Sequence, residues 1–144
     1  MNTSQHPATI LVVDDERAYR DAIADVLRSR GHTVLKAESA TEARKVLDLT
    51  TPELIMLDVM MPEVDGLTLL RQLASEPRFL AVPLVMASAK AMPTDRWAAW
   101  ERGASAYLAK PFTFEEVTSL VEHLLVPPAS DVVPIAMAER LAAV

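Results

Sequence analysis

The chain has 144 residues, 51% of them hydrophobic, with no cysteine and with 20 acidic against 14 basic side chains. This length and apolar content predict one domain with its own core, and the missing cysteines exclude disulfides, thiolate metal sites and cysteine nucleophiles. The acidic net charge argues against direct nucleic-acid binding. No apolar run reaches the roughly 20 residues that span a bilayer, and the N-terminus lacks the basic start of a secretory signal. We therefore expect a cytoplasmic protein.

Short apolar runs typical of buried strands alternate with longer segments whose apolar residues recur at helical spacing. Two helices open with a capping box, one at Ser39 and one at Thr113, each with glutamate three residues later. The predicted elements, in chain order, are strand 9–13, helix 16–30, strand 33–37, a helix from Ser39 that ends before Pro52, strand 53–57, a helix that begins after Gly66, strand 83–87, helix 94–102, strand 105–108 and a helix from Thr113 to Leu125.

Strict alternation of five strands and five helices predicts an α/β fold, a doubly wound parallel sheet with helices on both faces. In such folds ligands bind beyond the carboxyl ends of the strands. Five polar residues come just after the ends of the predicted strands: Asp14, Asp15, Asp58, Ser88 and Lys110. We therefore expect them to converge on one edge of the sheet.

Three carboxylates at one edge repel one another unless a countercharge is present, and Mg²⁺ prefers such oxygen ligands together with water and phosphate. Lys110 adds a fixed positive charge, and the Ser88 hydroxyl offers a hydrogen bond to a phosphoryl oxygen. Asp58 is the best nucleophile candidate, because aspartate accepts phosphoryl groups as an acyl phosphate. Asp14 and Asp15 would hold the metal.

The chain resembles a two-component response-regulator receiver domain over about residues 8–126. The resemblance rests on the order and spacing of Leu-Val-Val-Asp-Asp-Glu at 11–16, Leu-Asp-Val-Met-Met-Pro at 57–62, Asp65-Gly66, Ala-Ser-Ala at 87–89, Tyr107 and Lys-Pro-Phe at 110–112. It implies a flavodoxin-like strand order 2-1-3-4-5 and phosphorylation of Asp58.

The resemblance also implies roles for individual residues. Mg²⁺, with Mn²⁺ as an alternative, would be held by Asp15, Asp58 and the backbone carbonyl of Met60, with Asp14 assisting through water. Lys110 would contact phosphate and Asp58 and precede a cis proline bond. Ser88 would bind a phosphoryl oxygen and, on moving, let the Tyr107 ring turn inward. Met60 is apolar where relatives are commonly polar, which predicts slower hydrolysis of the acyl phosphate.

The implied partners are a sensor histidine kinase or a histidine phosphotransfer protein as donor, and a downstream protein target. The face formed by helix 94–102, strand 105–108 and the last helix is a candidate homodimer surface. We expect an N-terminal lead over 1–7, the receiver over 8–126 and a tail over 127–144 that could form a short helix but is too short for an output domain.

Several alternatives stay open at this point. Asp14 and Asp15 could only cap the first helix, Ser88 could be an ordinary loop residue, and Tyr107 could be a core aromatic. A Mg²⁺-dependent aspartyl-phosphate phosphatase or phosphotransferase would use a similar sheet but needs a second acid where Met60 stands. A receiver-like module that binds partners without phosphate is the third alternative.

Overall fold

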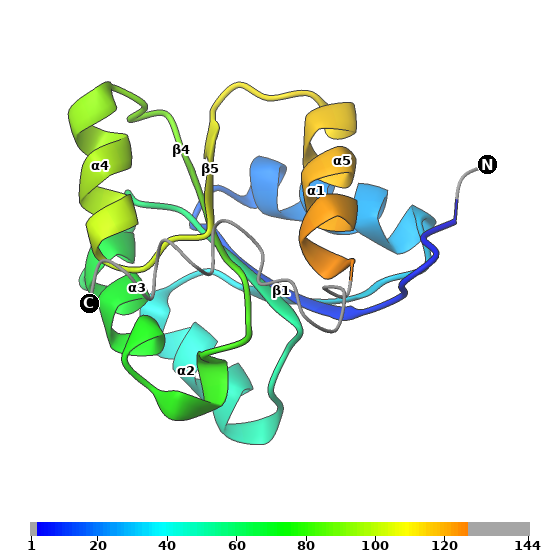
Figure 1. Cartoon of the computed structure of the whole chain (residues 1–144), viewed down its shortest axis with the longest axis horizontal. Helices are drawn as coiled ribbons and strands as arrows, with labels where there is room; N and C mark the ends of the chain where they lie inside the picture. The colour runs from blue at the N-terminus through cyan, green and yellow to red at the C-terminus, as the bar shows by residue number, and fades with distance from the viewer. Residues whose placement is uncertain (1–2, 127–144) are drawn as a thin grey trace, which may run out of the picture.

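A computed structural model describes residues 3–126, which form a parallel sheet with helices on both faces (Figure 1). The strands are β1 (Thr9–Val13), β2 (Thr33–Ala37), β3 (Leu54–Leu57), β4 (Leu84–Ser88) and β5 (Ala106–Ala109). The helices are α1 (Arg17–Ser29), α2 (Ala40–Leu49), α3 (Gly66–Ala74), α4 (Pro93–Glu101) and α5 (Phe114–Leu125). The predicted alternation is confirmed.

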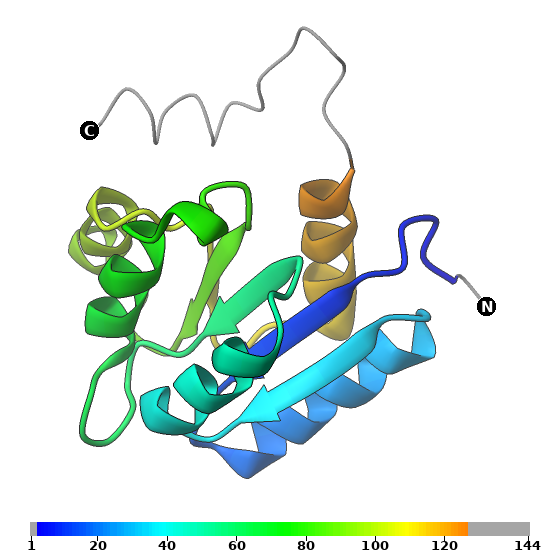
Figure 2. The ribbon, with the colours of Figure 1, turned by 90° about the horizontal axis from the view of Figure 1, so that it is seen from below.

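The five strands lie in the order β2-β1-β3-β4-β5, and every neighbouring pair is parallel. This is the expected order 2-1-3-4-5. Figure 2 shows the sheet from a second direction, with α1 and α5 on one side and α2, α3 and α4 on the other. The order reverses between β1 and β3, and ligands of doubly wound sheets bind where it does so.

Two apolar layers hold the helices to the sheet, because successive strand side chains point to opposite faces. From β1, Leu11 and Val13 belong to the layer shared with α2, α3 and α4, whereas Ile10 and Val12 belong to the layer under α1 and α5. The four residues of β3 are all buried, which explains why they form a continuous apolar run.

Polar side chains cap the N-termini of three helices: the capping box predicted at Thr113 forms in full, the one predicted at Ser39 forms only the bond to the Ser39 hydroxyl, and the cap at Asp65 was not predicted. The Ser39 hydroxyl accepts a hydrogen bond from the Glu42 backbone N–H, and Thr113 and Glu116 form a reciprocal capping box at α5. The Asp65 carboxylate caps α3 by accepting from the Thr68 N–H. These caps set where each chain segment leaves the edge of the sheet.

Element ends differ from the prediction by one or two residues. β4 begins at Leu84 and not at Pro83, since proline has no N–H for the ladder, and α4 begins at Pro93, whose fixed φ suits a first helical turn. A 3₁₀ turn at Pro77–Phe79, which buries Phe79, was not predicted.

The expected tail over 127–144 lies outside the described residues. Within residues 3–126 no helix is long and apolar enough to cross a membrane.

Candidate functional site

Backbone pairing brings the strand-end residues together. Asp14 follows β1 and Asp58 follows β3, and these adjacent strands are paired up to Val13 and Leu57, with the Asp58 N–H donating to the Val13 carbonyl at 2.9 Å. At the neighbouring strands β4 and β5, the Lys110 N–H after β5 donates to the carbonyl of Ser88 at the end of β4, at 2.9 Å. Four of the five predicted residues therefore lie along one edge of the sheet.

The ammonium of Lys110 joins the carboxylates of this edge. Its Nζ lies 2.8 Å from Asp14 Oδ2 and 3.4 Å from Asp58 Oδ2, and the three side chains are only 3–4% exposed. Buried charges are tolerated when they are paired in this way. One ammonium facing two buried carboxylates leaves the centre with an excess of negative charge.

The same environment shifts the pKa of both Asp58 and Lys110. The pKa of Asp58 is raised to about 6, chiefly by burial and also by the charge of Asp14, while the Met60 N–H and the Lys110 ammonium act to lower it. Burial by itself lowers the pKa of Lys110, but its hydrogen bond to Asp14 and the nearby carboxylates outweigh burial and raise it. A positive ligand beside Asp58 would relieve the energetic cost of ionising it.

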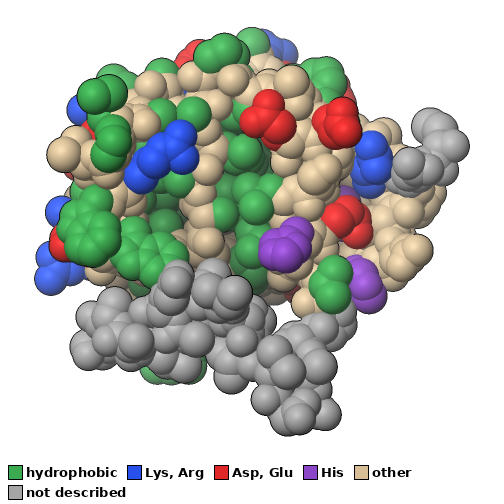
Figure 3. Space-filling view, turned by 45° about the horizontal axis from the view of Figure 1, so that its top comes forward, with side chains coloured by type: hydrophobic (Ala, Val, Ile, Leu, Met, Phe, Trp, Pro, Cys, Tyr) green, Lys and Arg blue, Asp and Glu red, His purple; other side chains and the backbone are tan. Residues whose placement is uncertain are grey.

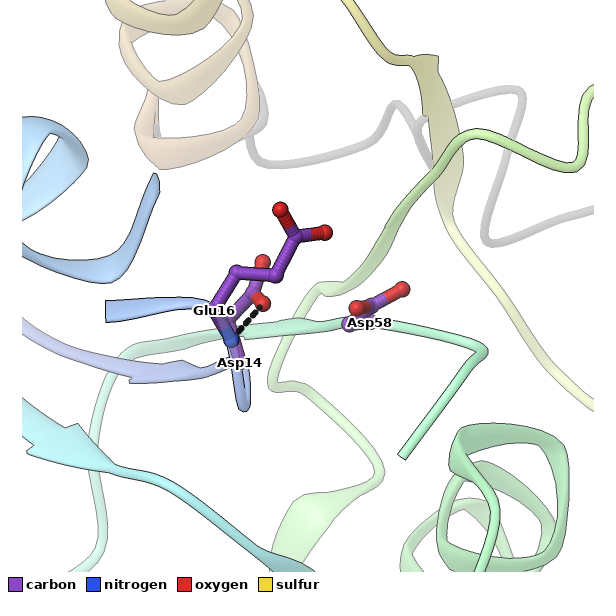
Figure 4. Close-up of side chains that lie close together, drawn as sticks. All are labelled: Asp14, Glu16 and Asp58. Atoms are coloured by element: carbon purple, nitrogen blue, oxygen red, sulfur yellow. Dashed lines mark hydrogen bonds between the residues drawn. The ribbon is translucent and has the colours of Figure 1, made fainter. Parts of the chain in front are cut away.

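Glu16 joins the carboxylate group that the structure forms, whereas Asp15 does not. Oxygens of Asp14, Glu16 and Asp58 all lie within 4.8 Å of one another, and Figure 4 shows the three side chains beside each other. Glu16 Oε1 lies 3.4 Å from Lys110 Nζ. The sequence prediction missed Glu16, although it directly follows the two aspartates. Asp15 is exposed at the start of the loop to α1.

Asp14 also orders the turn that leads into α1. Its Oδ1 accepts the Glu16 N–H at 2.9 Å, and its carbonyl accepts a hydrogen bond from the Arg20 guanidinium at 2.8 Å. The N-cap residue of α1 is Glu16, whose side chain forms no cap bond. Asp14 therefore closes the turn before α1 and does not cap the helix, so the capping alternative does not account for it.

Ser88 and Tyr107 both bind the backbone of Lys90. The buried Ser88 Oγ accepts the Lys90 N–H at 3.1 Å, and the Tyr107 hydroxyl donates to the Lys90 carbonyl. The Tyr107 ring is half-buried, and the Arg96 guanidinium lies 5.4 Å from its centre. A change at Ser88 can thus reach Tyr107 through one residue of the loop between β4 and α4.

A family model described as the response regulator receiver domain matches residues 10–122. The chain belongs to the response regulator receiver domain family. It is 38% identical over 120 residues to the response regulator Rre1 of Synechocystis sp., covering 83% of this chain and 52% of that protein. It is 39% identical over 119 residues to the response regulator MprA of Mycobacterium sp., covering 83% and 51%. The chain thus spans about half the length of the curated relatives it matches.

Solved structures give the same result for the fold of the receiver domain. A putative response regulator from Chloroflexus aurantiacus superposes with a TM-score of 0.79 at 33% identity, covering 84% of this chain and 99% of that one. The receiver domain of NtrX from Brucella abortus superposes with a TM-score of 0.75 at 32% identity, covering 81% and 97%. Both matches extend over nearly the whole of the other chain.

The charged centre of this receiver domain fits a hard divalent cation. Its donors are carboxylate oxygens, which Mg²⁺ prefers over nitrogen or sulfur. Two of them are buried beside a single ammonium, so a further positive charge is favourable there. The Met60 N–H donates to Asp58 Oδ1 at 3.1 Å and orients that carboxylate, and the bond between Lys110 and Pro111 is cis.

The receiver domain exposes one tryptophan on α4. Trp97 is 61% exposed, whereas Trp100, three residues later, is half-buried. Figure 3 views the side of β5 together with the carboxyl edge and shows hydrophobic side chains at the surface among charged ones. An exposed aromatic side chain of this size is typical of a surface that contacts another protein.

Proposed function

We propose that this receiver domain accepts a phosphoryl group on the carboxylate of Asp58 and signals through protein–protein contact. The observation that carries the proposal is the position of Asp58: a buried carboxylate at the switch point of the sheet, 3.4 Å from the Lys110 ammonium. The donor is a phosphohistidine of a sensor histidine kinase or of a histidine phosphotransfer protein. We place the receiver at residues 8–126, which the family match at 10–122 supports, and the exchange in the cytoplasm.

In the proposed transfer, one oxygen of Asp58 forms a bond to phosphorus while the bond from phosphorus to the histidine nitrogen breaks. The imidazole nitrogen leaves with the electron pair of that bond. The Met60 N–H holds one Asp58 oxygen at 3.1 Å and so orients the carboxylate. Lys110 and the Ser88 hydroxyl neutralise and bind the phosphoryl oxygens, since phosphoryl transfer depends mainly on positioning and charge stabilisation.

Mg²⁺, with Mn²⁺ as the alternative, supplies the positive charge that the carboxylates and the phosphoryl oxygens require. We propose that Asp15, Asp58 and the Met60 carbonyl hold it, with Asp14 assisting through water. Asp15 is exposed and free of the packing that fixes Asp14, so its side chain can turn toward the edge. Glu16 then pairs with Lys110.

The output contact is proposed for the face of α4, β5 and α5. Trp97 supplies an exposed aromatic anchor, and Tyr107 on β5 links this face to Ser88 through Lys90. A downstream protein target is the proposed occupant, and a second copy of the chain is the alternative. Light scattering of the chain with and without beryllium fluoride, a phosphoryl mimic, separates these two occupants. Only the formation of a homodimer raises the molar mass of the chain measured alone.

Incubation with MgCl₂ and acetyl phosphate tests phosphorylation directly. We expect intact-mass spectrometry to show one phosphoryl adduct that lasts for minutes, that Asp58→Asn abolishes and that the exposed control Asp48→Asn retains. Rapid repeated release of phosphate would favour the phosphatase alternative. Failure to form any adduct would favour a module that binds without phosphate.

A further inference from the structure

The Lys110 ammonium rests on an aromatic ring. Its Nζ lies 4.2 Å from the centre of the Tyr19 ring, which projects from the first turn of α1. A cation at this distance over an aromatic face is attracted by the ring quadrupole. Lys110 therefore has a fourth neighbour besides the carboxylates of Asp14, Glu16 and Asp58.

A second aromatic side chain fixes the Tyr19 ring. The rings of Tyr19 and Phe112 lie 5.6 Å apart with a tilt of 57°, which is a favourable geometry for an aromatic pair. Both belong to an apolar groove of about 180 Å³ between α1 and the start of α5, lined also by Ala18, Ala22, Ile23 and Phe114. Phe112 lies two residues after Lys110, so one short segment supplies both the ammonium and the ring that supports Tyr19.

The ring differs from the other neighbours of Lys110 in the kind of attraction it offers. Carboxylates accept the N–H donors of the ammonium, so each would have to give up a donor when a phosphoryl oxygen enters. The Tyr19 ring attracts the charge through its face and leaves the three donors for oxygen partners. A lysine side chain is flexible, and a support of this kind limits its movement without competing for its hydrogen bonds.

We propose that Tyr19 is a positioning residue that holds Lys110 within reach of the phosphoryl group while leaving its donors free. This inference rests on the proposed transfer to Asp58. The aromatic ring carries the effect, and the hydroxyl of Tyr19 does not. Replacement by phenylalanine therefore preserves the function, whereas leucine, which is apolar but has no ring, impairs it.

A nuclear magnetic resonance measurement on the full chain tests the contact without any phosphorylation. We expect the ring current of Tyr19 to shift the resonances of the Lys110 side-chain methylene groups upfield, because the ammonium lies 4.2 Å from the ring centre. We expect this shift to persist in Tyr19→Phe and to vanish in Tyr19→Leu and Tyr19→Met. Phe114→Leu is the matched control, because it removes an exposed ring of the same groove. Unshifted Lys110 resonances in the unaltered chain would overturn the proposal.

A second measurement tests the effect on phosphoryl binding. At saturating MgCl₂, we expect Tyr19→Leu to lower the affinity for beryllium fluoride and the rate constant of phosphorylation by acetyl phosphate about fivefold, with Tyr19→Phe and Phe114→Leu within about twofold of the unaltered chain. Mg²⁺ affinity stays the same in all of them, because the carboxylates are untouched. Equal values for Tyr19→Leu and Tyr19→Phe would overturn the positioning role. If the unaltered chain forms no adduct, the proposed function fails, while the ring-current result still decides whether Tyr19 holds Lys110.

Discussion

Gly66 packs directly against the backbone of Asp58. A Cβ added at Gly66 would lie 1.9 Å from the Asp58 carbonyl oxygen and 2.9 Å from the Cα of Val59. The Gly66 N–H donates to the Val59 carbonyl at 2.9 Å, so the first residue of α3 is fastened to the loop that follows β3. Because the two backbone segments approach each other so closely, only glycine, which has no side chain, fits at this position.

Gly66→Ala is expected to destabilise the domain and displace Asp58. The added methyl group must push backbone atoms apart, which costs about 2 to 4 kcal/mol of unfolding free energy in urea titrations. It should also lower the phosphorylation rate. Gly31→Ala, at a positive φ of 96° but remote from Asp58, serves as the control: it lowers stability yet leaves the rate unchanged. Equal rate losses in the two variants would contradict a specific role for Gly66.

The raised pKa of Asp58 predicts a pH-dependent cost in the absence of divalent cations. The pKa rises from 3.8 to about 6 through burial, so the folded domain binds this proton more tightly than the unfolded chain does. The contribution of protonated Asp58 to the free energy of unfolding is fully present below about pH 4 and is lost as the pH rises through about 6. In EDTA, we expect Asp58→Asn to gain about 2 to 3 kcal/mol over the unaltered chain between pH 4 and pH 7.

Urea unfolding across this pH range measures that gain, and Asp48→Asn provides an exposed carboxylate for comparison. Saturating MgCl₂ should reduce the difference at neutral pH, because a bound cation stabilises ionised Asp58. Unfolding free energies that run parallel for Asp58→Asn and the unaltered chain would mean that the carboxylate is not destabilised.

Mg²⁺ affinity should depend more on Asp15 than on Glu16. Loss of a direct ligand in Asp15→Asn lowers the affinity at least about tenfold, whereas Glu16→Gln removes one exposed charge beside Lys110 and costs about threefold or less. Isothermal titration calorimetry with MgCl₂ measures both values. The reverse ranking would give the ligand role to Glu16, which the structure places with Asp14 and Asp58.

Ser88 and Tyr107 should act as one unit, because each binds a backbone group of Lys90. We expect Ser88→Ala and Tyr107→Phe each to reduce the chemical-shift change of the α4 and β5 amides on adding beryllium fluoride. Their combined effect should be smaller than the sum, as for residues that share a partner. A Ser88→Ala domain that still switches fully would rule out this coupling.

Met60 should prolong the life of the acyl phosphate. Its side chain is apolar and 53% exposed beside Asp58, so it offers no hydrogen bond to a water molecule that attacks phosphorus. Met60→Asn is expected to shorten the phosphoryl lifetime about threefold or more, measured by loss of the adduct mass. Met92→Asn alters another exposed methionine and should leave the lifetime unchanged. An identical lifetime for Met60→Asn would refute the idea.

The amino-acid sequence alone determined the fold class and most of the strand-end residues. Apolar period and strict alternation predict the parallel sheet, and Asp14, Asp58, Ser88 and Lys110 each lie within two residues of the end of a predicted strand. Local patterns suffice to predict these elements, because a buried strand requires a continuous apolar run and a helix cap requires particular polar residues at fixed spacing. The predicted start of β4 was wrong by one residue, because Pro83 has no N–H for the strand ladder.

Only the tertiary structure decided which side chains meet. Glu16 and not Asp15 lies with the buried carboxylates, Tyr19 lies under Lys110, and Gly66 lies against Asp58. These contacts join residues from different elements, and their distances depend on how α1 and α3 pack on the sheet. Spacing along the chain places residues on an edge, but the choice of partners across that edge follows from packing in three dimensions.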